Sequence, residues 1–334
     1  MNPLETVLDT LFGQSLVVLG DVFLDEYLLG RAQRLSREAP VPVLEYRGRS
    51  HLAGGGANPA VNAAALGAKV RLIGVVGDDP EAATLRGLLT GAGVDVSGLI
   101  TDAGRPTILK TRIMAEGELR FPQQLARIDR LSRLPLDPAI ESNAITALRR
   151  LTLGAKASAI LISDYRSGLV SPAVVEAAHD LARERSLILA ADAQGELDKY
   201  HGFTLVKCNR AEAESFLGRQ LGNDDDTANA LAALGERLNI GCALITRGSR
   251  GISIGIKGAG CTHIAAANVS EVYDVTGAGD TVIAVATLAL CAGADPESAA
   301  RLANIAAGIV VRRWGNAVVT RDELLAHVRA ANRD

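Results

Sequence analysis

The chain has 334 residues, of which 48% are hydrophobic, only 3% are aromatic and 34 are glycine. Its 35 Lys and Arg residues against 38 Asp and Glu residues give a formal net charge of −3, and the charges are scattered, so nucleic acid is not an expected partner. The apolar stretches are too short to span a bilayer and the N-terminus lacks the order of a signal peptide, so we expect a cytoplasmic protein with no membrane partner.

The first predicted strand is the apolar run 16–20, which delivers Asp21 to the edge of a sheet. From 27 to 50, polar and apolar residues are mixed and two prolines interrupt the pattern, which predicts short edge strands outside the main sheet. A second extended segment, 105–129, is expected to pair with the first. The two segments together would form a flap, or lid.

After the lid, three glycines lead into an Ala-rich helix that ends at Gly67, and a strand is expected over 69–77. From about residue 139, apolar strands alternate with helical spans. This alternation predicts a mostly parallel sheet with helices on both faces, a three-layer α/β/α sandwich. No repeat or linker interrupts the chain, so we expect one domain, 1–334, with a small β-strand lid. The later strands are expected at 159–162, 187–191, 204–206 and 243–246.

The strongest motif is the run 276–281, Thr-Gly-Ala-Gly-Asp-Thr, followed by an apolar helix expected to begin near Thr281. Small residues let backbone N–H groups approach an anion, and the helix dipole adds to their effect. A carboxylate beside a bound phosphate is unfavourable, so we expect Asp280 to face an attacking hydroxyl and take its proton. The alternative is that Gly277 and Gly279 form a tight turn and Asp280 caps the helix.

Two motifs far apart in the chain resemble one family. Asp274-Val-Thr-Gly-Ala-Gly-Asp280 resembles the C-terminal signature of the ribokinase (PfkB) family of carbohydrate kinases, and Gly54-Gly-Gly-Ala-Asn58 resembles its N-terminal signature. The resemblance implies a ribokinase-like fold and ATP-dependent phosphorylation of a hydroxyl. Asp280 would be the base, while the amides of Gly277, Ala278 and Gly279 would stabilise the transferring phosphoryl group.

The resemblance also implies a nucleotide site. Asn209-Arg-Ala-Glu212 is similar to the family motif that helps to place Mg²⁺ and the ATP phosphates, and 246–251 resembles the nucleotide loop. Taken alone, the first motif could equally be a helix N-cap and the second a hairpin turn. The residues expected to bind the cofactor are Asn209, Glu212, Thr246, Arg247, Gly248, Gly251, Asn304 and Gly308, the last two from the run beside the adenine.

Asp274 and Thr276 occupy positions that hold a monovalent cation, K⁺, in some members of the family. At the other end of the site, Asp21 and Asp25 would accept hydrogen bonds from sugar hydroxyls. Gly54, Gly55 and Asn58 would close the opposite side. Simple solvation at the surface is the alternative for Asp25.

Within the family, the runs Gly20-Asp-Val-Phe-Leu-Asp25, Ser163-Asp-Tyr165 and Glu271-Val-Tyr-Asp274 resemble motifs of the bacterial heptose 7-phosphate kinases. Those kinases phosphorylate the anomeric hydroxyl of a sugar that already carries a phosphate. Arg127 on the lid would then bind that phosphate, because its forked donors suit oxyanions. Asp164 follows a strand on the same side and is also expected to bind the substrate. The runs 163–168 and 192–194 lack two lysines that those kinases have near the pocket, which leaves the sugar open.

Three other functions remain open from the sequence. The chain could phosphorylate another sugar, such as ribose or fructose; it could be a nucleoside kinase acting on adenosine; or it could be a non-catalytic sensor of a nucleotide or sugar. We expect a stand-alone kinase. Edge strands need cover, so a homodimer through the lid is also expected.

Overall fold

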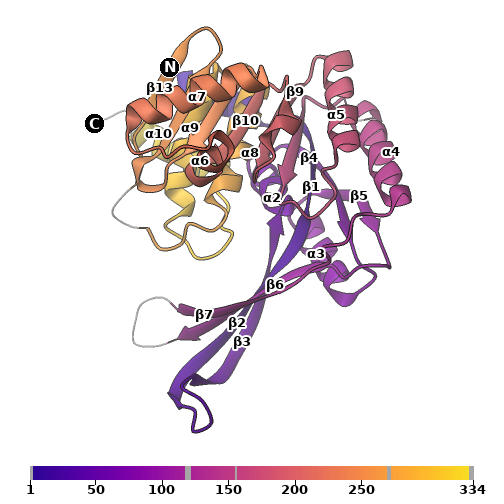
Figure 1. Cartoon of the computed structure of the whole chain (residues 1–334), viewed down its shortest axis with the longest axis vertical. Helices are drawn as coiled ribbons and strands as arrows, with labels where there is room; N and C mark the ends of the chain where they lie inside the picture. The colour runs from indigo at the N-terminus through magenta and orange to yellow at the C-terminus, as the bar shows by residue number, and fades with distance from the viewer. Residues whose placement is uncertain (1–2, 117–121, 155, 269–271, 331–334) are drawn as a thin grey trace.

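The computed structural model describes residues 3–116, 122–154, 156–268 and 272–330, and within these ranges its centre is a nine-stranded sheet (Figure 1). The strand order is β13-β12-β11-β10-β9-β8-β1-β4-β5. Only β12 and β13 run antiparallel to their neighbours, so the predicted, mostly parallel sheet is confirmed. The strands are β1 (Ser15–Gly20), β4 (Lys69–Val76), β5 (Asp95–Thr101), β8 (Ala159–Asp164), β9 (Ile188–Ala193), β10 (Leu205–Asn209), β11 (Cys242–Thr246), β12 (Ile252–Ile256) and β13 (Gly260–Ile264).

Helices cover both faces of this sheet, which confirms the predicted three-layer arrangement. The apolar side chains form two cores, one on each side of the sheet. The first core is covered by α1 (Pro3–Leu11), α2 (Ala57–Ala65), α3 (Pro80–Gly91), α8 (Ala278–Cys291), α9 (Pro296–Val310) and α10 (Arg321–Ala330). The second is covered by α4 (Pro138–Gly154), α5 (Pro172–Arg185), α6 (Arg210–Leu217) and α7 (Asp224–Leu238).

Helix α8 is the most enclosed of the helices near the predicted motif. Every residue from Asp280 to Ala289 is buried, because α2 and α9 pack against it on the sheet. The helix begins at Ala278, three residues before the expected start near Thr281, because Gly277 is its N-cap residue with φ +77°. Asp280 therefore lies in the first turn. None of the helices in the described ranges is both long and apolar enough to cross a membrane.

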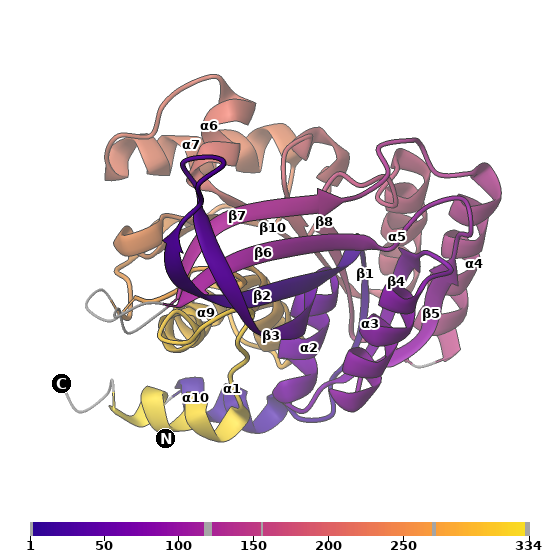
Figure 2. The ribbon, with the colours of Figure 1, turned by 90° about the horizontal axis from the view of Figure 1, so that it is seen from below.

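The lid is a second sheet, which projects from the helix-covered body (Figures 1 and 2). Its strand order is β3-β2-β6-β7. The strands are β2 (Val22–Leu35), β3 (Pro42–Gly55), β6 (Ile108–Glu116) and β7 (Gln123–Arg130). Residues 117–121, which belong to the second predicted lid segment, lie outside the described residues.

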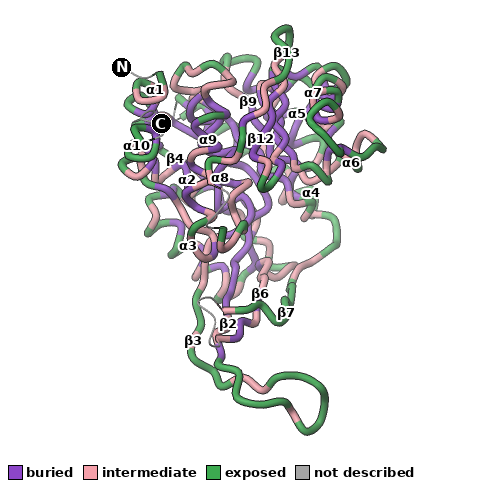
Figure 3. Tube along the Cα trace, turned by 90° about the vertical axis from the view of Figure 1, so that its left-hand side faces the viewer, coloured by how far each residue is buried: buried purple, intermediate pink, exposed green. Residues whose placement is uncertain are grey.

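The prediction of short edge strands over 27–50 was wrong. β2 and β3 each have 14 residues and pair along nearly their whole length, with two register irregularities. The prolines do not interrupt them, because Pro40 lies in the turn and Pro42 is the first residue of β3, where no ladder hydrogen bond is lost. Figure 3 shows that the end of the lid is exposed, whereas most of the strands of the body are buried.

Candidate active site

The carboxylate of Asp280 is buried at the N-terminus of α8, with only 5% of the residue exposed. Asn58 Nδ2 donates to its Oδ2 (2.8 Å) and the Tyr165 hydroxyl donates to its Oδ1 (2.9 Å). No side-chain hydrogen bond caps the helix, so the interpretation of Asp280 as a helix cap fails. Gly277 has to be glycine here, since a Cβ would lie 2.5 Å from Asn58 Nδ2 in a left-handed backbone conformation.

The orientation of the Asn58 amide follows from a chain of hydrogen bonds between α2 and α8. Thr281 Oγ1 donates to Asn62 Oδ1, and Asn62 Nδ2 donates to Asn58 Oδ1, each at 3.0 Å. The Asn58 oxygen is thereby occupied, which leaves its nitrogen to face Asp280. Asn58 was predicted to close one side of the sugar site, which stays a prediction; its amide nitrogen contacts the candidate base.

Lys207 lies directly beneath the glycine run, and sequence reasoning missed it. Its Nζ is 2.8 Å from both carboxylate oxygens of Asp192, and a Cβ on Gly279 would lie 2.7 Å from this Nζ. Burial would lower the pKa of Lys207, but the Asp192 carboxylate outweighs burial and raises it, so the lysine stays charged. The signal in the sequence was a single lysine inside an otherwise apolar strand.

The surroundings of Asp280 bring its titration to neutral pH. Burial, and then the negative charge of Asp192, raise the pKa of Asp280 to about 7. The hydrogen bonds from Asn58 and Tyr165 and the charge of Lys207 act in the opposite direction. A carboxylate with this pKa can accept a proton near pH 7, which suits a general base.

Asp25 is held from two sides at the root of the lid. It is 1% exposed, pairs with Arg112 through Oδ1, and accepts a hydrogen bond from Asn316 Nδ2 at Oδ2 (2.8 Å), so it is not a solvated surface residue. Asn316 also donates to the Ala53 carbonyl oxygen (2.9 Å). Sequence reasoning missed Asn316, because nothing in the sequence links the segment after α9 to β2.

Gly54 and Gly55 are required by packing around Phe23. A Cβ on Gly54 would lie 2.5 Å from the Phe23 ring, and a Cβ on Gly55 would overlap the Asp21 carbonyl oxygen. Gly55 also has φ +59°, which disfavours any residue with a Cβ. These glycines therefore shape the lid root, whatever else they contact.

Asp21 and Asp164, which were predicted to bind substrate, are each held by three hydrogen-bond donors of the protein itself, and a role in substrate binding stays a prediction. Asp21 accepts hydrogen bonds from the backbone N–H groups of three residues in the loop after β8: Tyr165 (3.0 Å), Ser167 (2.9 Å) and Leu169 (3.3 Å). Asp164 accepts hydrogen bonds from the Arg166 backbone N–H (2.8 Å), Lys199 Nζ (2.7 Å) and the Tyr200 hydroxyl (2.6 Å). Asp21 therefore stabilises the loop after β8, and Asp164 joins this loop to the turn at 197–200, since buried carboxylates need such partners.

The two lysines that the sequence lacks near Asp164 and Asp192 have counterparts in space. Lys199 contacts Asp164, and Lys207 contacts Asp192, each from a different element. Arg127, the predicted phosphate ligand, lies on the exposed strand β7 and forms a two-point ion pair with Asp129 at 2.9 Å.

On the nucleotide side, Asn209 and Glu212 form a capping box at the start of α6. Glu212 N donates to Asn209 Oδ1 (2.9 Å), and Asn209 N donates to Glu212 Oε2 (2.6 Å). This is the N-cap that the residues alone allowed. Thr246 lies beside Asn209 as its register partner in the sheet, so the two motifs do adjoin.

The segment 246–251 is the turn of the antiparallel β11–β12 hairpin. Arg247 is buried, pairs with Asp224 on α7 and donates from Nη2 to the Arg250 carbonyl oxygen (3.1 Å), so it anchors the turn. Gly248 and Gly251 have φ of +61° and +81°. A contact of Arg247 with the nucleotide stays a prediction.

Asn304 and Gly308 lie on α9, where this helix contacts the segment that follows β13. Asn304 Nδ2 donates to the Ala265 carbonyl oxygen (2.8 Å), and a Cβ on Gly308 would lie 3.0 Å from the Ala267 Cβ. Asp274 accepts hydrogen bonds from the backbone N–H groups of Thr276 (2.9 Å) and Gly315 (3.0 Å).

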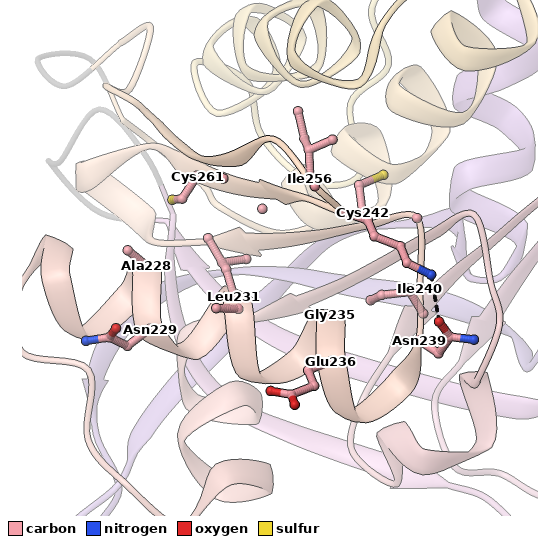
Figure 4. A pocket seen from close by; sticks show the side chains of 16 residues that line it. Ala228, Asn229, Leu231, Gly235, Glu236, Asn239, Ile240, Cys242, Ile256 and Cys261 are labelled. Carbon is pink, nitrogen blue, oxygen red and sulfur yellow. Dashed lines mark hydrogen bonds between the residues drawn. The ribbon is translucent and has the colours of Figure 1, made fainter.

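Within the described ranges, no group of three or more His, Cys, Asp or Glu side chains could hold a metal ion. A cavity of about 670 Å³ lies under α7, between this helix and the β12–β13 hairpin (Figure 4). Leu231, Ile256 and Cys261 are among the residues that line it, and none of the predicted site residues does. The cavity is therefore separate from the candidate active site around Asp280.

Comparison with known proteins gives a consistent result. The model of the pfkB family of carbohydrate kinases matches residues 14–321. The bifunctional protein HldE of Geobacter metallireducens is 40% identical over 92% of this chain, and that of Caulobacter vibrioides is 40% identical over 96%. The chain spans only 62% and 64% of those two proteins.

Solved structures show the same fold at low identity. Arabidopsis thaliana ribokinase, complexed with ribose and ATP, has a TM-score of 0.73 at 18% identity and covers 95% of this chain and 99% of its own. Escherichia coli phosphofructokinase-2, in complex with potassium, has a TM-score of 0.76 at 18% identity, with 96% and 100% covered. The ribokinase-like fold expected from the motifs is thus confirmed.

Proposed function

Because the chain belongs to the pfkB family of carbohydrate kinases and is a sugar kinase, we propose that it phosphorylates a sugar phosphate with ATP, with Asp280 as general base. The position of Asp280 carries the proposal. Its buried carboxylate lies at a helix N-terminus, beside the charged Lys207, and its pKa is about 7. Such a carboxylate can take a proton from a hydroxyl next to an incoming phosphoryl group.

In the proposed reaction, the acceptor oxygen bonds to the γ-phosphorus of ATP while its proton passes to Asp280. The bond from this phosphorus to the β,γ-bridging oxygen breaks, and ADP leaves. The amides of Gly277, Ala278 and Gly279 and the Lys207 ammonium would stabilise the charge on the phosphoryl group. The glycine run suits a phosphate because it presents no side chain at Gly277 or Gly279, with the ammonium directly beneath.

Magnesium bound with ATP would neutralise phosphate charge. The site is compatible with it, since Mg²⁺ commonly takes one or two carboxylates and completes its shell with substrate phosphates and water. Glu212, at the start of α6 and close to the strand end that carries Thr246, is our candidate for an indirect contact with Mg²⁺. We also propose Asp274 and Thr276 as the place of a monovalent cation, because their segment is tied to Gly315 beside the glycine run.

The choice of a sugar phosphate rests on the cations of the lid. Lys110 and Arg112 of β6 and Arg127 of β7 lie on one face, Arg112 and Arg127 being register partners. Arg112 and Arg127 are paired with carboxylates, whereas Lys110, in the part of the chain that the structure describes, makes no ion pair. Its Nζ lies 5.2 Å from the centroid of Tyr165, the residue that contacts Asp280. An anionic group on the sugar would supply the missing partner.

The sugar itself is a finer proposal. The motif resemblance favours heptose 7-phosphate, phosphorylated at its anomeric hydroxyl, and the likeness to the HldE proteins agrees with that family branch. Other sugar phosphates, free ribose or fructose, and adenosine are the competing acceptors. A sensor without turnover is the remaining alternative.

The test is ADP release with paired acceptors: heptose and its 7-phosphate, fructose and its 6-phosphate, ribose and its 5-phosphate, together with adenosine. We expect kcat/KM to favour the phosphorylated member of at least one pair by 10-fold or more, an estimate of about 1.4 kcal/mol for one charged contact. Lys110→Met should then raise KM for that sugar phosphate and leave KM for ATP unchanged.

Lys69→Met removes an exposed lysine of β4 and is the matched control, expected to behave like the wild type. Equal turnover of free and phosphorylated sugars, with Lys110→Met silent, would reject the sugar-phosphate proposal. Binding without ADP release from any acceptor would favour the sensor instead.

A further inference from the structure

Tyr165 connects two parts of the molecule that the sequence places far apart. Its hydroxyl donates to Asp280 Oδ1 (2.9 Å), and its ring packs edge-on against Phe23 of β2, with centroids 5.1 Å apart and an interplanar angle of 88°. One end of the side chain therefore contacts the candidate base. The other contacts the root of the lid.

The backbone of Tyr165 is fixed independently of both contacts. Asp21 accepts a hydrogen bond from the Tyr165 N–H and from two further N–H groups of the same loop. Because these hydrogen bonds hold the backbone of the loop, the Tyr165 ring can move only by rotation about its side-chain torsions. A shift of Phe23 would thus be passed to the hydroxyl.

The lid side of this contact is a small stack. Lys110 Nζ lies 3.6 Å from the centroid of Phe23 and 5.2 Å from that of Tyr165, within the range of cation–π attraction. Gly54 and Gly55 leave room for the Phe23 ring on its other side. Phe23 and Lys110 belong to the two central strands of the lid, which pair directly.

We propose that Tyr165 is a positioning residue that couples the lid to the base: its hydroxyl orients the Asp280 carboxylate while its ring rests on Phe23 and Lys110. This inference rests on the proposed role of Asp280. When the lid strands move over a bound sugar, the ring follows, and the carboxylate is turned with it. The base is thereby aligned when the lid is in place.

Four groups face Asp280 and must be considered in any test by titration. They are Asn58 from α2, Tyr165 from the loop after β8, Asp192 from β9 and Lys207 from β10. Asp192 disfavours the ionised base; the other three favour it. Burial raises the pKa of Tyr165 well above its usual range, so its hydroxyl remains a donor at neutral pH.

The first experiment replaces only the hydroxyl. In Tyr165→Phe, the ring contact with Phe23 is retained, so we expect the fold to persist and the pKa of Asp280 to rise by about one unit from loss of one hydrogen bond to a charged group. The measurement is the pH titration of the ¹³C carboxyl resonance of Asp280 in the full chain, assigned by its loss in Asp280→Asn. It needs no substrate, so it stands apart from the test of function.

Tyr200→Phe is the matched control, because it removes a buried hydroxyl that donates to a different carboxylate, Asp164 (2.6 Å). Tyr200→Phe should leave the pKa of Asp280 unchanged. An unchanged Asp280 titration in Tyr165→Phe would overturn the inference.

The second experiment tests the link to the lid by a double-mutant cycle on kcat, using any acceptor that the wild type phosphorylates. If Phe23 acts on the base through the Tyr165 hydroxyl, Phe23→Leu lowers kcat in the wild type but has little further effect in Tyr165→Phe. Additive effects of the two substitutions would reject the coupling, even where the hydroxyl itself proves to orient Asp280.

Discussion

At the scale of single residues, the site depends on how each carboxylate is partnered. Asp280 has one hydrogen-bond donor on each oxygen and a buried ammonium nearby, whereas Asp21 and Asp164 are each bound by three donors. A carboxylate with three protein donors is a structural anchor. A carboxylate with two donors, such as Asp280, can still accept a hydrogen bond from a substrate hydroxyl.

Asp280→Asn is the most direct test at this scale. We expect kcat to fall by at least about 100-fold, since a general base commonly contributes 10²–10⁴, while ATP binding is retained because the amides of the glycine run are unchanged. The measurement is ADP release beside ATP titration by calorimetry. Near-normal turnover would contradict the role of Asp280.

The same variant should alter the pH dependence of stability. Burial raises the pKa of Asp280 from 3.8 to about 7, so the folded state binds this proton more tightly than the unfolded chain. The contribution to the free energy of unfolding is fully present below about pH 4 and is lost as pH rises through 7. Asp280→Asn should thus be more stable than the wild type at pH 8, by up to roughly 4 kcal/mol, and the gap should narrow at pH 5. Urea unfolding at both pH values measures the difference in the free energy of unfolding between the variant and the wild type. An equal difference at pH 5 and pH 8 would contradict the raised pKa of Asp280.

At the scale of elements, the root of the lid is held together by close backbone packing. β3 reaches the body at Gly54 and Gly55, where the Phe23 ring and the Asp21 carbonyl oxygen leave no room for a Cβ. The far part of the same strand is exposed and open. The strand is therefore sensitive to substitution at one end only.

A pair of alanine substitutions in β3 tests this difference. Gly55→Ala should lower the free energy of unfolding by about 2 kcal/mol or more, since φ is +59° and the methyl group would overlap Asp21. Gly48→Ala, with nothing within 4 Å of its Cβ, should change stability by no more than about 0.5 kcal/mol. Urea midpoints decide, and equal losses at the two positions would refute the packing argument.

At the scale of the whole molecule, the lid leaves apolar side chains exposed. Tyr46 on β3 and Ile128 on β7 are 70% and 58% exposed, and Leu35, Val41 and Leu125 are exposed elsewhere on the lid. We propose that a second copy of the chain covers them, because projecting strands with exposed apolar residues need a partner. That the chain acts as one domain with this lid also remains a prediction.

Light scattering tests the proposed dimer. The wild type should have the mass of two chains at micromolar concentration, and the Tyr46→Glu/Ile128→Glu double variant that of one, because buried charges in an apolar interface are unfavourable. Leu153→Glu, at an exposed apolar position on α4 (45%), is the control and should leave the mass unchanged. A monomeric wild type would reject the lid dimer.

The pattern of residues was sufficient to predict the layered fold and to single out the run around Asp280. Apolar runs of strand length that alternate with helical spans predict a parallel sheet from local sequence, and a small-residue run before a helix predicts an anion site. The partners of these residues became visible only in the folded chain. Tyr165, Lys207 and Asn316 reach the site from three segments, and Asp21 binds the loop after β8. The reason is physical: a strand pattern fixes where a residue lies in the sheet, but contacts between distant segments decide which neighbour its side chain meets.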